Sequence, residues 1–134
     1  MKEIIIDADK AIYGRLCSFV AKKALEGNKI IIINSEKIII TGNKKNIIDK
    51  YNTMRKKGGS SLRGPNYPKI GYLMLKRGIR GMLPDYRRGI GKQAFSNIKC
   101  FNGVPEEYKD KKKIKTGKDY PEKYIELKEL AGKI

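Results

Sequence analysis

Arginine is the residue type in this sequence whose placement points most clearly to a chemistry. Its planar guanidinium group grips two phosphate oxygens at once and also stacks on nucleobases, whereas lysine acts more like a point charge. Six of the seven arginines lie within residues 44–92, which carry 14 basic and only 2 acidic side chains. These six are Arg55, Arg63, Arg77, Arg80, Arg87 and Arg88. The same segment holds eight of the 14 glycines and four tyrosines, a profile typical of a surface that faces RNA.

The composition of the whole chain narrows the class of partner and argues against most enzyme classes. The 134 residues carry a net charge of +17, so the expected partner is a polyanion, with nucleic acid favoured over an anionic membrane surface. The sequence has no histidine and therefore lacks the commonest general base and zinc ligand. Cys17 and Cys100 are too far apart for a Cys-x-x-Cys site, and we expect both to be small core residues in a reducing cytoplasm. No apolar run approaches the roughly 18–20 residues of a membrane helix.

Two short motifs bear on an enzymatic alternative. Residues 89–94 match the relaxed dinucleotide pattern G-x-G-x-x-A, but they do not follow a strand, as that fold requires. Asp7 and Asp9 lie at the end of the first predicted strand, where a carboxylate pair could hold Mg²⁺. Capping of the following turn by one of them is the favoured interpretation. A small nucleotide-binding α/β enzyme, using this strand end and Gly14, stays open as an alternative.

Short isoleucine runs predict the centre of the fold. Residues 4–6, 30–33 and 38–40 do not alternate with polar residues, which is typical of strands buried on both faces of a parallel sheet. The apolar spacing over residues 16–24 predicts a helix that ends just before Gly27. A strand, a helix and a second strand within about 30 residues form a βαβ unit.

The rest of the chain divides at a stretch rich in glycine, serine and proline, residues 56–69, which we expect to be an exposed loop. A helix capped by Asn43 precedes this loop, and mixed elements follow it. The predicted elements are helices over about 43–55, 70–83, 90–97 and 121–131, a strand over 98–101, a turn at Asn102-Gly103, and an irregular segment over 105–119.

Several strings occur in an order and spacing that match a known family. They are Asp7-Ala8, Tyr13-Gly14-Arg15-Leu16-Cys17-Ser18, Ala21-Lys22, Ile33-Asn34, Ile40-Thr41-Gly42-Asn43, Arg63-Gly64-Pro65, Arg80-Gly81-Met82-Leu83-Pro84, Arg88-Gly89, Ala94-Phe95 and Gly103-Val104-Pro105. On these strings the chain resembles the large-subunit ribosomal protein family L-thirteen over about residues 3–109. The first predicted strand begins almost at Met1. In this respect the chain resembles the short archaeal members of the archaeal and eukaryotic branch of the family.

The resemblance implies an α/β fold of three α/β/α layers with a small, mainly parallel four-stranded sheet. A basic Gly/Pro-rich loop region and an irregular-to-helical C-terminal tail complete the expected architecture. We expect one domain over residues 1–134. Its sheet core would span about 3–55 and 90–104, its basic RNA-facing insertion about 56–89, and its C-terminal extension about 105–134.

The resemblance also implies a function: a structural constituent of the large ribosomal subunit that binds ribosomal RNA and supports subunit assembly. No catalysis, cofactor, metal or small-molecule substrate is implied. The expected partners are large-subunit ribosomal RNA and neighbouring large-subunit ribosomal proteins, with no membrane, and the expected location is the cytoplasm, in the ribosome. We expect the isolated chain to be a monomer. An RNA-binding chaperone or regulator outside the ribosome is a further alternative.

Carried onto this sequence, the resemblance and the charge pattern select the same segment for RNA binding. Arg63, Arg80, Arg87 and Arg88 are expected to contact phosphates. Gly64 and Gly81 would let the backbone approach the RNA, and Pro65 would stiffen its turn. The wider basic field comprises Lys44, Lys45, Arg55, Lys56, Lys57, Lys69, Lys76, Arg77 and Lys92. Asp85-Tyr86 stand where the family often has basic or small polar residues.

Overall fold

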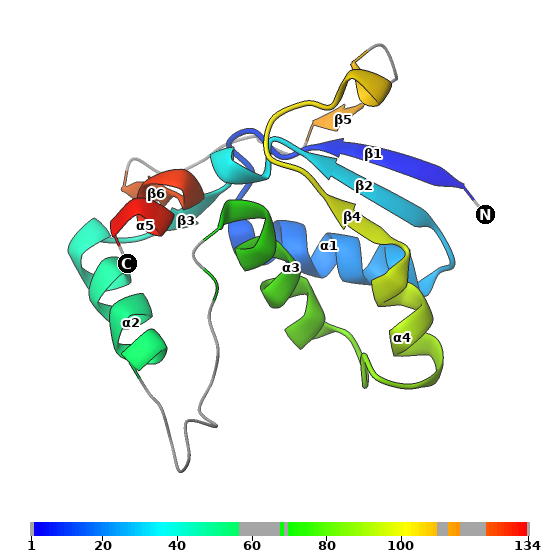
Figure 1. Cartoon of the computed structure of the whole chain (residues 1–134), viewed down its shortest axis with the longest axis horizontal. Helices are drawn as coiled ribbons and strands as arrows, with labels where there is room; N and C mark the ends of the chain where they lie inside the picture. Colours follow the sequence, from blue (N-terminus) through cyan, green and yellow to red (C-terminus); the bar gives the residue numbers. More distant parts are fainter. Residues whose placement is uncertain (1, 57–67, 69, 110–112, 116–122, 134) are drawn as a thin grey trace.

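A four-stranded parallel sheet forms the centre of the computed structural model, which describes residues 2–56, 68, 70–109, 113–115 and 123–133 (Figure 1). Its spatial order is β4–β2–β1–β5, and each neighbouring pair is parallel. The strands are β1 (Glu3–Asp7), β2 (Lys29–Ile33), β4 (Ile98–Cys100) and β5 (Ile114–Lys115). The predicted α/β class with a small, mainly parallel four-stranded sheet is confirmed.

The two isoleucine strands β1 and β2 pair along their whole length, from Glu3 opposite Lys29 to Asp7 opposite Ile33. Ile30 and Ile32 contribute to a core cluster beneath the helices, whereas Ile31 and Ile33 pack on the opposite face of the sheet. All four isoleucines of β2 are fully buried. Burial on both faces explains why this run does not alternate with polar residues.

Three helices cover one face of the sheet: α1 (Tyr13–Leu25), α3 (Gly71–Met82) and α4 (Gly89–Ser96) (Figure 1). Helix α1 joins β1 to β2, as the predicted βαβ unit requires, and ends before Gly27, whose φ of 95° suits a glycine. The two cysteines lie in this core as free thiols, as predicted. Burial raises the pKa of both Cys17 and Cys100 to about 12, so both stay protonated at neutral pH.

The other face of the sheet has a thin covering made by the segment after β4. The 3-10 helix η3 (Glu106–Tyr108) places the buried Tyr108 against Ile31 and Ile33, with Phe101 and Val104 packed beside it. The rings of Phe101 and Tyr108 lie 6.0 Å apart between centroids. This segment forms the third layer of the predicted architecture.

A two-stranded antiparallel sheet lies beside the main one and corrects part of the prediction. The isoleucine run at 38–40 was expected to form a strand of the parallel kind, but β3 (Ile39–Thr41) pairs with β6 (Tyr124–Glu126) instead. The predicted helix over 121–131 starts only at Leu127, as α5 (Leu127–Lys133). The reason is that Ile125 is buried between half-buried Tyr124 and Glu126, an alternation that suits a strand. The 105–119 segment, expected to be irregular, contributes η3 and the edge strand β5.

The chain between the two sheets is short, and the next helix packs on the core cluster through Ile47, with Ile48 and Tyr51 against its edge. The 3-10 helix η1 (Ser35–Lys37) links β2 to β3, and α2 (Lys44–Lys56) follows β3. Asn43 caps α2 as predicted, since its Oδ1 accepts a hydrogen bond from the Lys45 amide at 2.9 Å. Ile47 is the only residue of α2 classed as buried, so most of this helix surface is available to solvent or to a partner.

Candidate nucleic-acid interface

Helix α3 has two faces of opposite character. Met74, Leu75 and Ile79 are buried in the core cluster. Lys76, Arg77 and Arg80 are half-buried, and all three line a hollow of about 250 Å³ at the surface together with Pro68, Leu73 and Phe95. Three cations around one hollow make a concave, positively charged surface, which favours an anionic ligand.

The turn between α3 and α4 holds two arginines against a tyrosine ring. The guanidinium carbon of Arg80 lies 4.7 Å from the centroid of the Tyr86 ring, and that of Arg87 lies 5.3 Å from it. Arg87 Nε also donates a hydrogen bond to the Tyr86 hydroxyl at 3.2 Å. Cation–π contacts of this kind orient the planar groups while leaving their N–H edges available for phosphate oxygens.

The charge around Tyr86 changes its acidity and that of its partner. The hydrogen bond from Arg87 lowers the pKa of Tyr86, and the nearby charges of Arg87, Arg80 and Arg77 act in the same direction. The same hydrogen bond raises the pKa of Arg87. Tyr86 itself is braced edge-on by Phe95, with ring centroids 6.1 Å apart, and Lys76 Nζ lies 5.4 Å from the centre of the Phe95 ring. The arginines and Lys76 therefore share one aromatic support.

Asp85 and Gly91 fix the shape of this turn. Asp85 Oδ1 accepts a hydrogen bond from the Arg87 amide at 3.1 Å, and its Oδ2 lies 4.0 Å from Arg88 Nε. A Cβ on Gly91 would overlap the carbonyl oxygens of Pro84 and Asp85, so α4 can pack on the turn only with glycine there. Packing at Gly91 and the positive φ of 58° at Gly89 thus explain both glycines of the G-x-G-x-x-A match.

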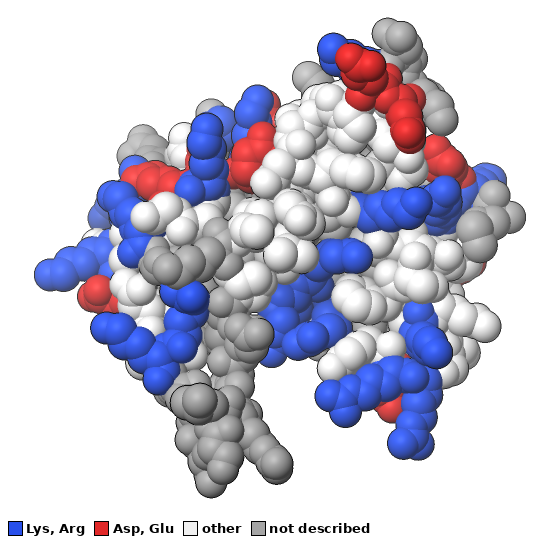
Figure 2. All heavy atoms as spheres, in the orientation of Figure 1, with Lys and Arg blue, Asp and Glu red and all other residues white. Residues whose placement is uncertain are grey.

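The structure brings together many of the predicted site residues and separates others. We use the term basic face for six cationic side chains of α3, the following turn and α4, of which the first three line the hollow: Lys76, Arg77, Arg80, Arg87, Arg88 and Lys92. Gly81 is exposed at the end of α3, with space beside its backbone, as a close approach would need. Figure 2 shows many blue side chains over α2, α3 and the turn before α4, whereas most red atoms are spread along the upper half of this view, where other blue side chains also lie.

The cations of α2 form a second group beside the basic face. Lys45 and Lys56 are exposed, and Arg55 is half-buried. Lys44 is turned toward α5, where its Nζ lies 3.4 Å from a carboxylate oxygen of Glu129. The remaining predicted residues, Lys57, Arg63, Gly64, Pro65 and Lys69, lie outside the residues that the structure describes.

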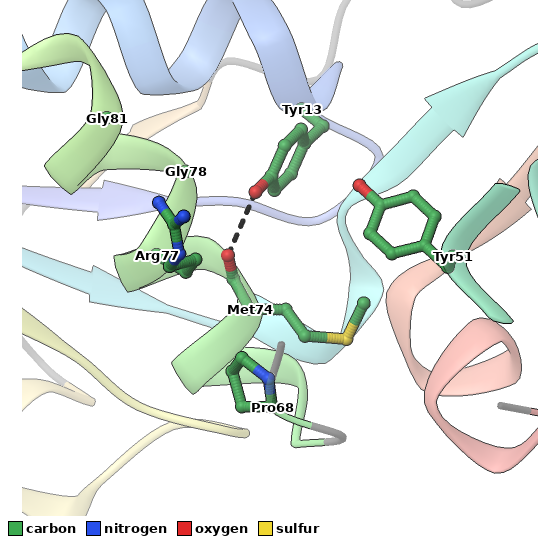
Figure 3. A pocket seen from close by; sticks show the side chains of 7 residues that line it. All are labelled: Tyr13, Tyr51, Pro68, Met74, Arg77, Gly78 and Gly81. Carbon is green, nitrogen blue, oxygen red and sulfur yellow. Dashed lines mark hydrogen bonds between the residues drawn. The ribbon is translucent and has the colours of Figure 1, made fainter. Parts of the chain in front are cut away.

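A second pocket lies between α2 and α3 and contains residues that the sequence did not single out as a site (Figure 3). It is lined by Tyr13, Tyr51, Pro68, Met74, Arg77, Gly78 and Gly81. The Tyr13 hydroxyl donates a hydrogen bond to the Met74 carbonyl at 2.9 Å. Tyr51 is one of the four tyrosines of residues 44–92 and also fits the apolar stripe of its helix, whereas no sequence pattern connects Tyr13 of α1 with Met74, 61 residues further along the chain.

The strand end considered for a nucleotide or metal site has a structural role. Asp7 Oδ1 accepts hydrogen bonds from the Asp9 amide at 3.1 Å and from Asn34 Nδ2 at 3.0 Å. Asp7 therefore caps the turn after β1, as the favoured interpretation predicted. Among the described residues there is no cluster of three metal-ligating side chains, and no described helix is long and apolar enough to cross a membrane.

Comparison with known proteins assigns the chain to a family. The family described as ribosomal protein L13 matches residues 1–107. Large ribosomal subunit protein uL13 of Methanosarcina barkeri is 41% identical over 97% of this chain and 96% of its own length. The uL13 proteins of Methanocaldococcus jannaschii (43% identity, 95% of this chain, 93% of the relative) and Picrophilus torridus (45% identity, 81% and 77%) are also similar. These relatives are archaeal and are named as ribosomal proteins rather than enzymes, as the resemblance implied. The chain belongs to the ribosomal protein L13 family.

Proposed function

We propose that the chain is a structural constituent of the large ribosomal subunit that binds large-subunit ribosomal RNA and supports assembly of the subunit. The observation that carries this proposal is the pair of guanidinium groups held on the Tyr86 ring, at 4.7 and 5.3 Å from its centroid. Side chains that are already ordered lose less conformational entropy when they bind, so each phosphate contact retains more of its free energy.

The basic face supports binding through phosphates more than through base edges. Three of its cations line the hollow on α3 and the others follow on the turn and on α4, so together they can contact several phosphates of a folded RNA backbone. Double-helical RNA is recognised mainly through its shape, phosphates and 2′-hydroxyls. The family to which the chain belongs, and the names of its relatives, support ribosomal RNA as the RNA concerned.

The salt dependence of binding tests this proposal. For about ten neutralised phosphates, the logarithm of the affinity for a large-subunit RNA transcript should fall with the logarithm of salt concentration at a slope of about −7 to −9. Replacing both Arg80 and Arg87 by alanine should weaken binding and reduce the steepness of the slope by about 1.4 to 1.8, or roughly 0.7–0.9 for each phosphate contact. Circular dichroism should show an unchanged fold.

A matched control removes two cations from the other side of the sheet. Lys99 is exposed on the strand face opposite the buried Ile98 and Cys100, and exposed Lys109 follows η3 on that side. The Lys99→Ala/Lys109→Ala variant should keep the slope of the unmodified chain. A flat salt response of the unmodified chain, or equal loss in both double variants, would contradict the assignment of RNA binding to the basic face.

Association with the subunit is tested separately in a native lysate. After sucrose-gradient fractionation in magnesium buffer and a high-salt wash, the chain should sediment with the large subunit. If it stays at the top of the gradient, the structural role in the subunit is wrong even where RNA binding by the isolated chain is measured.

A further inference from the structure

The pocket between α2 and α3 has the size of a single aromatic ring. Its volume is about 140 Å³. A protein cavity of about 150 Å³ accommodates benzene, whereas sites for drug-sized ligands and cofactors occupy about 300–1,000 Å³. The pocket is therefore too small for a whole nucleotide and has room for one six-membered ring.

The walls of this pocket are suited to an aromatic ligand. Tyr13 is held by its hydrogen bond to Met74, and Figure 3 shows the Tyr51 side chain reaching from α2 toward the same space, opposite Arg77 of α3. The thioether of Met74 and the ring of Pro68 add apolar surface. Two tyrosine rings, a thioether and a guanidinium group are the surfaces on which an unstacked base packs favourably.

The pocket adjoins the hollow of the basic face. Pro68 and Arg77 line both, so the two spaces share a wall. On the far side of that wall, Lys76 and Arg80 supply positive charge. A ring-sized apolar pocket next to a cluster of cations is complementary to one nucleotide, with its base in the first space and its phosphate in the second.

Glycines at two positions of α3 keep this arrangement open. A Cβ on Gly78 would overlap the Tyr13 hydroxyl, so the close approach of α1 and α3 that positions the Tyr13 ring depends on this glycine. Gly81 has only Arg77 Nη1 near the place of its missing Cβ, at 3.9 Å. The helix therefore presents bare backbone along one side of the pocket.

We propose that the Tyr13–Tyr51 pocket receives a single unpaired pyrimidine base of the bound RNA, while Lys76, Arg77 and Arg80 hold the phosphate of that nucleotide. The proposal rests on the proposed function, since the same basic face supplies the phosphate contacts. With this pocket the chain can distinguish an RNA helix that has one extruded base from a regular helix, which phosphate contacts alone cannot do.

Three RNA hairpins of equal length test this pocket: one fully paired, one with a single bulged uridine and one with an abasic residue at the bulge. Stacking of one base on aromatic side chains should make the uridine bulge bind about five-fold or more tightly than the other two. Tyr51→Ala should abolish that preference and leave the affinity for the paired hairpin unchanged, whereas Tyr51→Phe should keep the preference because the ring remains. Tyr124→Ala, which removes a half-buried tyrosine from β6, serves as the matched control and should also keep it.

Each outcome separates the pocket from the wider function. Equal binding of the uridine and abasic bulges, or a preference that persists in Tyr51→Ala, would overturn the base pocket while RNA binding by the basic face stands. If the chain binds none of the hairpins and no ribosomal RNA transcript, both the base pocket and RNA binding by the basic face are wrong. Free UMP at millimolar concentration should leave the melting temperature unchanged, and a shift of several degrees at micromolar UMP would assign the pocket to a free nucleotide instead.

Discussion

In the β1–β2 pair six of the ten side chains are buried isoleucines, whereas the basic face keeps its cations half-buried or exposed, three of them against aromatic rings. Helix α3 carries part of the basic face and also packs in the core cluster with isoleucines of these strands. Leu75 and Ile79 are fully buried on one of its sides, and Arg77 and Arg80 line the hollow on the other. Residues that determine folding and residues that determine binding therefore alternate within a few positions of the same helix. Substitutions one turn apart or less can thus change stability and RNA binding separately.

The largest expected effect comes from the sheet. Replacing the fully buried Ile32 by alanine should lower the free energy of unfolding by about 2–5 kcal/mol, because the substitution removes buried methyl groups and leaves a cavity. Urea denaturation measures this loss. The RNA affinity of the folded fraction should stay unchanged, since Ile32 is fully buried under the helices and cannot touch a ligand at the surface.

Ile90 is the matched control for this substitution. It is 67% exposed on α4, so Ile90→Ala should change stability by no more than about 0.5 kcal/mol. Equal destabilisation by the two alanine variants would break the contrast between a packed sheet and an exposed helical face. A loss of RNA affinity in folded Ile32→Ala would also break it, by showing that binding depends on the sheet.

Two glycines of α3, three residues apart, should respond with opposite sign. A methyl group on Gly78 would displace the Tyr13 hydroxyl from its hydrogen bond with Met74, an overpacking cost of about 1–3 kcal/mol that exceeds the helix-propensity gain. At Gly81 the methyl group meets only Arg77 Nη1, at an ordinary contact distance of 3.9 Å, so Gly81→Ala should stabilise the chain by up to about 1 kcal/mol. Thermal unfolding of both variants measures the difference. A stabilised Gly78→Ala variant would show that α1 and α3 do not pack as closely as described.

The sequence predicted the elements whose patterns are local. Runs of isoleucine at 4–6 and 30–33 identified β1 and β2, because such runs are typical of strands buried on both faces. The Asn43 cap and the apolar spacing that follows it identified α2. Counting charges identified the segment that carries the basic face, because the charge of a segment can be counted without knowledge of the tertiary structure.

Long-range pairing was beyond these patterns. The pattern of residues 124–126 is equally compatible with the start of a helix, and their pairing with β3 makes them a strand. The orientation of Arg80 and Arg87 on Tyr86 depends on the turn that returns α4 toward α3, which the sequence marks only by Pro84 and Gly91. The packing of α1, α2 and α3 brings Tyr13 and Tyr51 to one pocket, so no local sequence pattern predicts it.

The smallest expected effect concerns an ion pair on the packed side of the molecule, between Lys10 and Glu126. Lys10 Nζ lies 2.8 Å from Glu126 Oε1 and 5.2 Å from the centre of the Tyr124 ring, so it ties the turn after β1 to β6. The hydrogen bond to Glu126 raises the pKa of Lys10 from 10.5 to about 12. Folding therefore favours the protonated lysine, and the stabilisation is fully present below pH 10.5 and is lost as the pH rises through about 12.

About a third of each side chain is exposed, so water screens the pair and its contribution should stay below about 1 kcal/mol. Lys10→Met should lower the melting temperature slightly at pH 9, and the difference from the unmodified chain should shrink toward pH 12. Comparing the two chains at each pH cancels the titration of the other lysines and tyrosines.

RNA affinity at neutral pH should not change, because this cation stabilises the fold at a site outside the basic face. A Lys10→Met variant that binds RNA as weakly as the Arg80→Ala/Arg87→Ala variant would mean that total charge, and not the arrangement of cations on the basic face, determines binding.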